Sequence, residues 1–310
     1  MDTPGTPPYT CGFRNHLVPR TLPRLSVTYS DLHIAVSGPE NGDPVIILHG
    51  WGSSAQNMKP VEKALSPQFR THTIDLPGHG SSPLPPVPWG VPEHADLLRD
   101  YIQDVIGQPV TIFGHSNGGR IGLFMAATAP YTAHIARLVL VSPSGITPKR
   151  SWTTRAKAAL AKALKAPITS LPSPLREPAE DWLRHTVLWR ALGSSDYNRA
   201  TGTMRETFVK TVTHTLDGPV HRIDIPTLLF WGTADTAVRK PQIDHLRHAL
   251  TDCGVVELED AGHYGYLDEP ETVMSATRYF LKNTSADPGA LAADDIRAAG
   301  ADNADAEQAR

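Results

Sequence analysis

One serine stands among three glycines at residues 114–119, directly after an apolar run that ends at Phe113. The spacing of Gly114, Ser116 and Gly118 fits the pattern G-x-S-x-G. Between a strand and a helix, this pattern indicates a tight turn that lifts the serine hydroxyl clear of the sheet. A hydroxyl held in this way can attack an electrophile, so Ser116 is our candidate nucleophile.

A serine hydroxyl needs a general base, and the base needs an acid to orient it. Asp235 follows the apolar run at residues 228–231, and His263 follows a weaker run at residues 255–258. Both side chains are therefore expected just past late strands, on the same edge of a sheet as Ser116. The sequence predicts that Ser116, Asp235 and His263 form a catalytic triad, with Asp260 as the alternative acid.

Attack on a carbonyl carbon leaves a negative charge on oxygen, which backbone N–H groups can stabilise. The segment HGWG at residues 49–52 follows the first long apolar run, and its glycines let the backbone approach a substrate. We expect the backbone N–H groups of Trp51 and Asn117 to form this oxyanion hole. The side chain of His49 is expected to be structural rather than catalytic.

Apolar runs and helical patterns alternate along the chain, which predicts an α/β fold with a mostly parallel sheet flanked by helices. The strand-like runs lie at residues 25–29, 32–37, 45–48, 71–76, 110–113, 138–141, 227–231 and 255–258, and helical patterns lie at 94–105, 119–129, 240–250 and 271–282. The eight runs predict an eight-stranded sheet. Because most runs are continuously apolar, both faces of the sheet are expected to be covered.

Residues 147–216 interrupt this alternation with helical patterns at 152–165, 179–192 and 198–216. We expect them to form a helical cap over the carboxyl edge of the sheet, where open α/β sheets bind ligands. Some bulky apolar residues of the cap fit a pocket lining and a packed cap core equally well: Trp182, Leu183, Leu188, Trp189, Met204 and Phe208. The excess of basic residues in the cap is interpreted as a solvated surface rather than a lipid-binding one.

The chain is predicted to have four parts. They are a flexible N-terminal segment at residues 1–22, an α/β core at 23–146 and 217–283, the cap at 147–216, and a disordered acidic tail at 284–310. The tail is rich in alanine and aspartate and has no aromatic residue. It therefore offers too little apolar surface to offset the entropy of ordering it.

Composition narrows the possible functions. With 40% hydrophobic residues, 20% charged residues and a net charge of −3, the chain is typical of a globular protein without affinity for nucleic acid. It has no run long enough to span a membrane and no recognisable signal peptide, and two cysteines make a disulfide scaffold improbable, so a cytoplasmic location is expected. Neither a nucleotide-binding glycine motif nor metal-binding histidine spacing occurs, so no cofactor and no metal are expected. The oligomeric state stays open.

Taken together, five motifs resemble those of the α/β-hydrolase fold superfamily. They are HGWG at residues 49–52, DLPGHGSS at 75–82, GHSNGG at 114–119, GTAD at 232–235 and AGH at 261–263. The resemblance implies a serine hydrolase with a helical cap, in which Ser116 is the nucleophile, Asp235 the acid, His263 the base, and Trp51 and Asn117 the oxyanion donors. In one departure from the family pattern, Asp268 stands where members often carry a glutamate, five residues after the histidine.

The resemblance leaves the substrate open. Members with an aspartate nucleophile, such as haloalkane dehalogenases and epoxide hydrolases, are excluded by Ser116. Hydrolysis of a small-molecule carboxylic ester is the first choice, because a triad and an oxyanion hole suffice for it. A carbon–carbon bond hydrolase of the meta-cleavage type usually adds an arginine that holds a substrate carboxylate, for which Arg120 and Arg205 are candidates. Lipases, prolyl aminopeptidases, cofactor-free perhydrolases and a slow hydrolase that acts as a ligand receptor are further alternatives.

Overall fold

Seven strands form a single sheet in the computed structural model, which describes residues 27–148 and 195–284. In chain order they are β1 (Ile34–Ser37), β2 (Pro44–Leu48), β3 (Arg70–Ile74), β4 (Val110–His115), β5 (Ile135–Val141), β6 (Thr227–Gly232) and β7 (Cys253–Leu258). Their spatial order is β1-β3-β2-β4-β5-β6-β7. Strand β1 is antiparallel to β3, and all other neighbours are parallel. The predicted α/β fold with a mostly parallel sheet is confirmed.

The prediction of eight strands was wrong for the described part of the chain, which has seven. The extra strand was expected at residues 25–29, of which 25 and 26 lie outside the described residues. Tyr29 instead begins the 3-10 turn η1 (Tyr29–Asp31). The backbone N–H and the hydroxyl of Thr28 both donate to the Asp31 carboxylate, at 2.9 and 2.8 Å. Local bonds between side chain and backbone favour a turn over a strand here.

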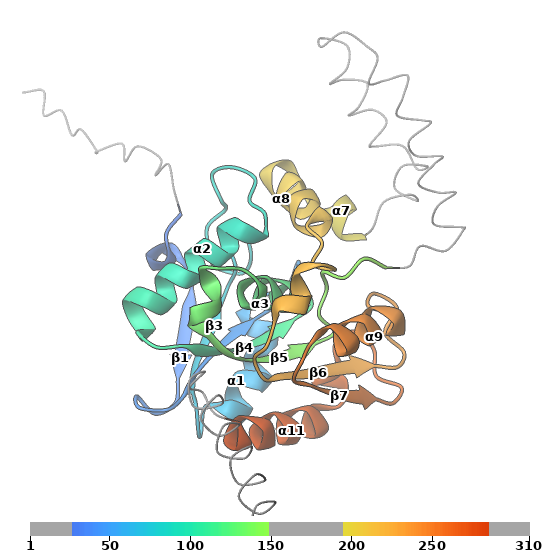
Figure 1. Cartoon of the computed structure of the whole chain (residues 1–310). Helices are drawn as coiled ribbons and strands as arrows, with labels where there is room; N and C mark the ends of the chain where they lie inside the picture. Colours follow the sequence, from blue (N-terminus) through green and yellow to red (C-terminus); the bar gives the residue numbers. More distant parts are fainter. Residues whose placement is uncertain (1–26, 149–194, 285–310) are drawn as a thin grey trace, which may run out of the picture.

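Helices cover both faces of the sheet (Figure 1). One face packs against α2 (Val91–Tyr101), α3 (Asn117–Ala127) and α9 (Lys240–Ala249), and the other against α1 (Lys59–Leu65) and α11 (Pro270–Asn283). Short turns complete the core: η2 (Ala55–Met58), η3 (Ile102–Ile106), η4 (Tyr131–His134), η5 (Pro219–Arg222) and α10 (Gly265–Asp268). Ile46 and Leu48 belong to the first cluster, whereas Val45 and Ile47 belong to the second. Since successive strand residues alternate between two apolar layers, the strands read as continuous apolar runs.

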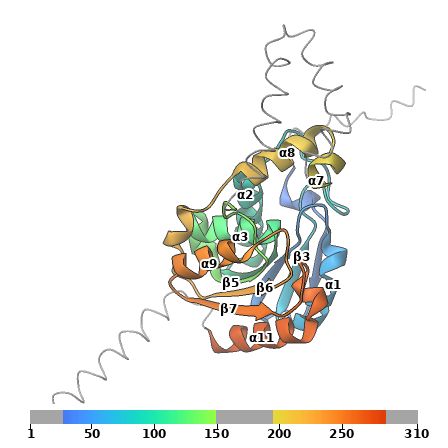
Figure 2. The same ribbon diagram turned by 90° about the vertical axis from the view of Figure 1, so that its right-hand side faces the viewer.

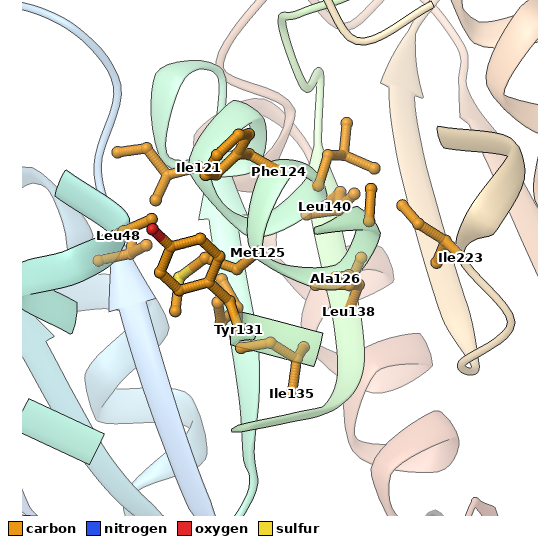
Figure 3. Close-up of a cluster of buried hydrophobic side chains, with 14 of the residues drawn as sticks. Leu48, Ile121, Phe124, Met125, Ala126, Tyr131, Ile135, Leu138, Leu140 and Ile223 are labelled. Carbon is orange, nitrogen blue, oxygen red and sulfur yellow. The ribbon is translucent and has the colours of Figure 1, made fainter. Parts of the chain in front are cut away.

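Helix α3 lies within the larger core cluster (Figure 3). Each of its residues is buried. Its side chains Ile121, Phe124 and Met125 pack in the same cluster as Leu48 of β2 and Leu138 of β5. This packing fixes α3, and with it the turn that precedes α3, relative to the sheet.

Helices α7 (Ser195–Arg199) and α8 (Gly202–Thr213) lie outside the sheet and its two helical layers, at one end of the core (Figure 2). The backbone N–H of Trp89 donates to Thr207 Oγ1 at 3.0 Å, and Lys210 Nζ donates to the carbonyl of Pro88 at 2.7 Å. These bonds attach α8 to the segment before α2. Together α7 and α8 take the place of the single helix expected at residues 198–216. The helical patterns at 152–165 and 179–192, the N-terminal segment at 1–22 and the tail after residue 284 lie outside the described residues.

Candidate active site

Ser116 lies in a strained turn between β4 and α3. Its φ is 49° and its ψ is −105°. Such a conformation costs on the order of 1–3 kcal/mol in a residue other than glycine and persists only where the surroundings impose it. The carbonyl of Ser116 accepts hydrogen bonds from the backbone N–H groups of Arg120 and Ser144, both at 3.0 Å. These bonds hold the backbone of the turn in place.

Close packing explains the glycines around Ser116. A Cβ atom at Gly114 would lie 2.6 Å from the backbone nitrogen of Gly119. A Cβ atom at Gly118 would overlap the carbonyl oxygen of Leu48, the last residue of β2. Only glycine lets β4, the start of α3 and the end of β2 approach one another this closely.

The loop after β2 brings Trp51 close to this turn. His49 fixes the loop, since its Nδ1–H donates to the carbonyl of Gly50 at 2.7 Å and its Nε2 accepts the N–H of Leu76 at 3.0 Å. Burial lowers the pKa of His49 to about 4, so the ring is neutral and can both donate and accept. The N–H of Gly118 donates to the His49 carbonyl at 3.1 Å and joins the loop to the turn around Ser116. His49 therefore has the structural role that the sequence predicted.

Asp235 and His263 are in direct contact. His263 Nδ1 donates to Asp235 Oδ2 at 2.9 Å, and Asp235 Oδ1 accepts the N–H groups of Ala237 and Val238 at 2.7 and 3.0 Å. Burial alone would raise the pKa of the Asp235 carboxyl, but the hydrogen bonds from His263 and Val238 outweigh it and hold this pKa below its ordinary value. Asp235 is therefore ionised at neutral pH. Because Nδ1 of His263 donates its proton to Asp235, the other ring nitrogen, Nε2, carries the lone pair of the neutral imidazole.

Two neighbouring side chains hold the loop that carries His263. His115 Nε2 donates to the His263 carbonyl at 3.0 Å, and burial lowers the pKa of His115 to about 3, so it is neutral beside His263. Asp268 Oδ2 accepts the N–H of Gly262 at 2.8 Å, so this aspartate supports the loop where relatives often have a glutamate. Asp260, the alternative acid, is exposed and makes no hydrogen bond to His263 in the described part of the chain.

Ser116 and His263 line one cavity of about 250 Å³, which we call the reaction cavity. Trp51 and Asn117, the expected oxyanion donors, line the same cavity. Asp235 is buried behind His263, so the structure brings together all five residues that the motifs predicted.

A second cavity of about 680 Å³ lies beside the first and shares Trp51, Asp196 and Tyr264 with it. Sequence reasoning missed Tyr264, although its position directly after His263 could have indicated it. Of the six candidate lining residues, Phe208 lines the reaction cavity and Met204 lines the second one. The other four lie outside the described residues.

The two arginines that the sequence left undecided differ in position. Arg120 is only 7% exposed and lines the reaction cavity. Arg205 Nε donates to the carbonyl of Ala200 at 2.8 Å, and its guanidinium carbon lies 5.4 Å from the centre of the Tyr197 ring. Of the two candidate arginines, Arg120 lines the reaction cavity and Arg205 does not.

Neither a metal site nor a membrane span is found in residues 27–148 and 195–284. No three side chains of the metal-ligating types come together there. The helices of these two ranges are all too short or too polar to cross a lipid bilayer.

Comparisons with known proteins agree on the fold. The pimeloyl-[acyl-carrier protein] methyl ester esterase of Nitrosomonas europaea is 24% identical over 262 residues, which cover 79% of this chain and 98% of the relative. An uncharacterised protein of Mycobacterium tuberculosis is 27% identical over 274 residues, which cover 81% of this chain and 77% of the relative. The solved enol-lactonase of Burkholderia xenovorans LB400 superposes with a TM-score of 0.61 at 21% identity, over 81% of this chain and 96% of that chain.

The sequence model of the alpha/beta hydrolase family matches residues 45–276, which include every strand from β4 to β7 and all five predicted site residues. This range is well over half of the chain. The chain therefore belongs to the alpha/beta hydrolase family and is a hydrolase.

Proposed function

We propose that this protein hydrolyses a carboxylic ester through a covalent acyl-enzyme, with Ser116 as the nucleophile, His263 as the general base and Asp235 as the acid that orients it. One observation carries the proposal: the 2.9 Å contact between His263 and Asp235 stands beside a cavity that Ser116 also lines. The ester bond is further supported by the relatives described as pimeloyl-[acyl-carrier protein] methyl ester esterases.

In the first half of the reaction, His263 Nε2 takes the proton of Ser116 Oγ as this oxygen attacks the carbonyl carbon. The carbonyl electron pair moves to oxygen and forms an oxyanion, to which the N–H groups of Trp51 and Asn117 donate. Asn117 is the first residue of α3, so the positive end of the helix dipole also faces this charge. The C–O bond to the alcohol then breaks, and the leaving oxygen takes the proton from His263.

In the second half, water takes the place of the alcohol. His263 Nε2 removes a proton from this water as its oxygen attacks the acyl carbon. The second tetrahedral intermediate collapses, the bond to Ser116 Oγ breaks, and the serine recovers its proton from His263. The products are a carboxylic acid and free enzyme. Asp235 stays ionised throughout and stabilises the imidazolium that forms in each half.

The two neighbouring cavities support an ester with one short and one long arm. The reaction cavity, at about 250 Å³, holds the ester group and the short arm. The second cavity, at about 680 Å³, has both apolar lining residues, such as Leu84 and Met204, and charged ones, Asp196 and Arg199, and it accepts the longer arm. Trp51 and Tyr264, which line both cavities, lie where the two arms meet.

Carbon–carbon bond hydrolysis is less well supported, because it calls for an arginine that holds a substrate carboxylate. Arg120 donates to three protein oxygens, those of Ser144, Thr211 and His214. Arg205 is engaged by Ala200 and Tyr197. Ester hydrolysis is the reaction that these residues support best.

The proposal is tested by an activity screen of the full chain with p-nitrophenyl esters of increasing acyl length, methyl esters, lactones, amides and a dienone acid. We expect ester hydrolysis, a loss of about 10⁴-fold or more in Ser116→Ala, and no labelling of this variant by a fluorophosphonate. Turnover of the dienone acid without turnover of any ester would replace the proposed reaction. A label that persists on Ser116→Ala would identify a different nucleophile.

A further inference from the structure

The segment inserted between β5 and β6 leaves the core and returns to it at one place. Residues 144–147 form the outgoing crossing, and residues 211–217 form the returning crossing. The backbone N–H and the hydroxyl of Thr147 donate to the Asp217 carboxylate, at 3.1 and 2.6 Å. The N–H of Leu216 donates to the carbonyl of Gly145 at 2.9 Å. The two crossings are therefore bonded to each other.

Arg120 reaches both crossings from helix α3, one turn after Ser116. Its Nε donates to Ser144 Oγ of the outgoing crossing at 3.2 Å. Its Nη1 donates to the carbonyl of Thr211 and, at 3.2 Å, to the carbonyl of His214. Both carbonyls lie at the carboxyl end of α8, where the returning crossing begins.

The end of α8 balances the buried charge of Arg120. The last carbonyls of a helix have no partner within the helix and carry partial negative charge. Burial lowers the pKa of Arg120 to about 10, which leaves the guanidinium charged at neutral pH. No carboxylate pairs with Arg120 within the described ranges. The guanidinium and the helix end thus satisfy each other, and separating them would leave both unpaired in a buried place.

Ser144 extends this contact to the turn around Ser116 at residues 114–119, which we call the nucleophile turn. Its hydroxyl accepts from Arg120 and donates to the carbonyl of Ser116 at 3.2 Å, and its backbone N–H donates to the same carbonyl at 3.0 Å. On the other side, α8 carries Phe208, whose ring centre lies 5.1 Å from that of Trp51. One set of contacts therefore connects the strained serine, the arginine and the wall of the reaction cavity.

We propose that Arg120 is a positioning residue that locks α8 to the nucleophile turn. In this role it holds the cavity wall of Phe208, Thr211 and Val212 at a fixed distance from Ser116. The inference rests on the proposed ester hydrolysis and adds a determinant of substrate size to it. Arg120 acts through α8 and Ser144 rather than on the reacting atoms. Phe208 packs against Trp51, which also lines the second cavity that takes the long arm, so the loss of Arg120 should impair long-chain esters more than an acetate.

The experiment compares Arg120→Met and Arg120→Lys with a matched control, Arg137→Met. Arg137 is also a buried arginine, and it donates to the carbonyls of Leu281 and Thr284 at the end of α11, at 2.9 and 2.8 Å. It lines neither cavity. For each protein, kcat and KM are measured with p-nitrophenyl acetate and p-nitrophenyl decanoate. Active sites are counted by fluorophosphonate titration, so that unfolded molecules do not enter the rates.

For Arg120→Met we expect the ratio of kcat/KM for decanoate to that for acetate to fall about tenfold, with a higher KM for decanoate. Labelling of its Ser116 by the small fluorophosphonate should stay within about threefold of wild type. Arg120→Lys, which keeps a charged donor at the end of α8, should recover part of the ratio. Arg137→Met should lower the melting temperature and leave the ratio unchanged.

If Arg120→Met leaves the decanoate-to-acetate ratio of kcat/KM unchanged, Arg120 has a purely structural role and the proposal is overturned. A loss confined to an ester with a free carboxylate, relative to its methyl diester, would also overturn it, because Arg120 would then bind substrate. If Arg120→Met does not fold, Ser144→Ala replaces it and should lower the ratio in the same direction; an unchanged ratio there contradicts the proposal. Failure of wild type to hydrolyse any ester, with Ser116 still labelled, would count against the proposed function instead.

Discussion

Three histidines close to Ser116 differ in their bonding partners, and these differences underlie the roles that we propose for them. His49 donates to one backbone group and accepts from another, so both ring nitrogens are engaged. His115 donates to a backbone carbonyl, and its Nδ1 has no partner within the described residues. Of the three, only His263 donates to a carboxylate. That bond fixes its tautomer and leaves Nε2 as the acceptor nitrogen that the proposed general base requires.

Replacing Asp235 tests this tautomer argument. An amide in its place can offer its NH₂ group to Nδ1 of His263, which favours the ring with its proton on Nε2, and that ring cannot accept a proton from Ser116. We expect Asp235→Asn to lower kcat for an ester by about 10⁴-fold with the fold intact by circular dichroism. Asp260→Asn is the matched control and should keep the wild-type rate. A fully active Asp235→Asn, or an inactive Asp260→Asn, would point to another acid.

The strain at Ser116 predicts that a glycine variant is more stable than an alanine variant, although glycine normally destabilises a folded chain relative to alanine. Alanine keeps the penalty of a positive φ, whereas glycine removes it. We therefore expect Ser116→Gly to unfold at a higher denaturant concentration than Ser116→Ala, by about 1 kcal/mol in the free energy of unfolding. Both variants should be inactive, so a difference in turnover cannot confuse the comparison. A more stable alanine variant would show that this backbone conformation is not strained in solution.

At the scale of elements, the glycines of the nucleophile turn set how closely β2, β4 and α3 approach one another. Gly118 meets the end of β2, where no room exists for a side chain. Gly218, at the start of η5, has open space around it and an ordinary φ of −83°. The two glycines thus separate the effect of packing from the effect of backbone freedom.

This contrast gives a paired prediction for alanine substitutions. Gly118→Ala forces α3 away from β2, so it should lower the melting temperature by several degrees, equivalent to about 1–3 kcal/mol, and suppress ester turnover. Gly218→Ala should change stability by less than about 1 kcal/mol, with no loss of turnover. Thermal unfolding and initial rates measure both variants. Equal effects of the two substitutions would contradict the packing argument.

The core elements were predictable because they carry their signal locally. The run expected at 110–113 is β4, and the pattern expected at 119–129 is α3, which begins two residues earlier, at Asn117. The apolar run at 25–29 misled the prediction because Thr28 and Asp31 form a turn through their own side chains. Helix α1 was missed because it has only 7 residues, too few for a clear period.

The site was predictable as a set of residues and not as a geometry. The carboxyl ends of parallel strands meet at one edge, so motifs that follow β2, β4, β6 and β7 had to converge there. The role of Arg120 had no such signal. Its partners Thr211 and His214 lie 91 and 94 positions away and approach it only because the returning crossing passes beside α3. A position four residues after Ser116 cannot by itself distinguish that contact from exposure to solvent.

For the molecule as a whole, buried histidines make stability depend on pH. Burial is the main cause that lowers the pKa of His49, His72 and His94 to about 4 and that of His115 to about 3. The same side chains in the unfolded chain have a pKa of about 6.5. The unfolded state therefore binds more protons than the folded state between pH 6.5 and about 4. The contribution of these four neutral histidines to stability is complete above pH 6.5, and it is lost as the pH falls from 6.5 to about 4.

We expect the free energy of unfolding to fall between pH 6.5 and 4, with each of these histidines contributing up to about 1.4 kcal/mol per pH unit. Denaturant unfolding at a series of pH values measures this slope. His94 lies outside both cavities and donates to the carbonyl of Gly90 at 2.6 Å, so His94→Gln keeps a donor and removes a titrating group. This variant should have a shallower slope by about one proton. A stability that is constant from pH 7 to pH 4 would contradict the burial argument.

The bonds between Thr147 and Asp217 have a consequence for how this protein can evolve. They join the residue at which the insertion leaves the core to the residue at which it returns, so the two ends of the insertion lie side by side. For a loop with fixed ends, doubling the length costs only about 0.6 kcal/mol. A longer or shorter insertion between these two ends would therefore change the closure cost of the chain only slightly. Selection for a new substrate is then free to remodel the insertion, provided that each version returns a helix end to Arg120.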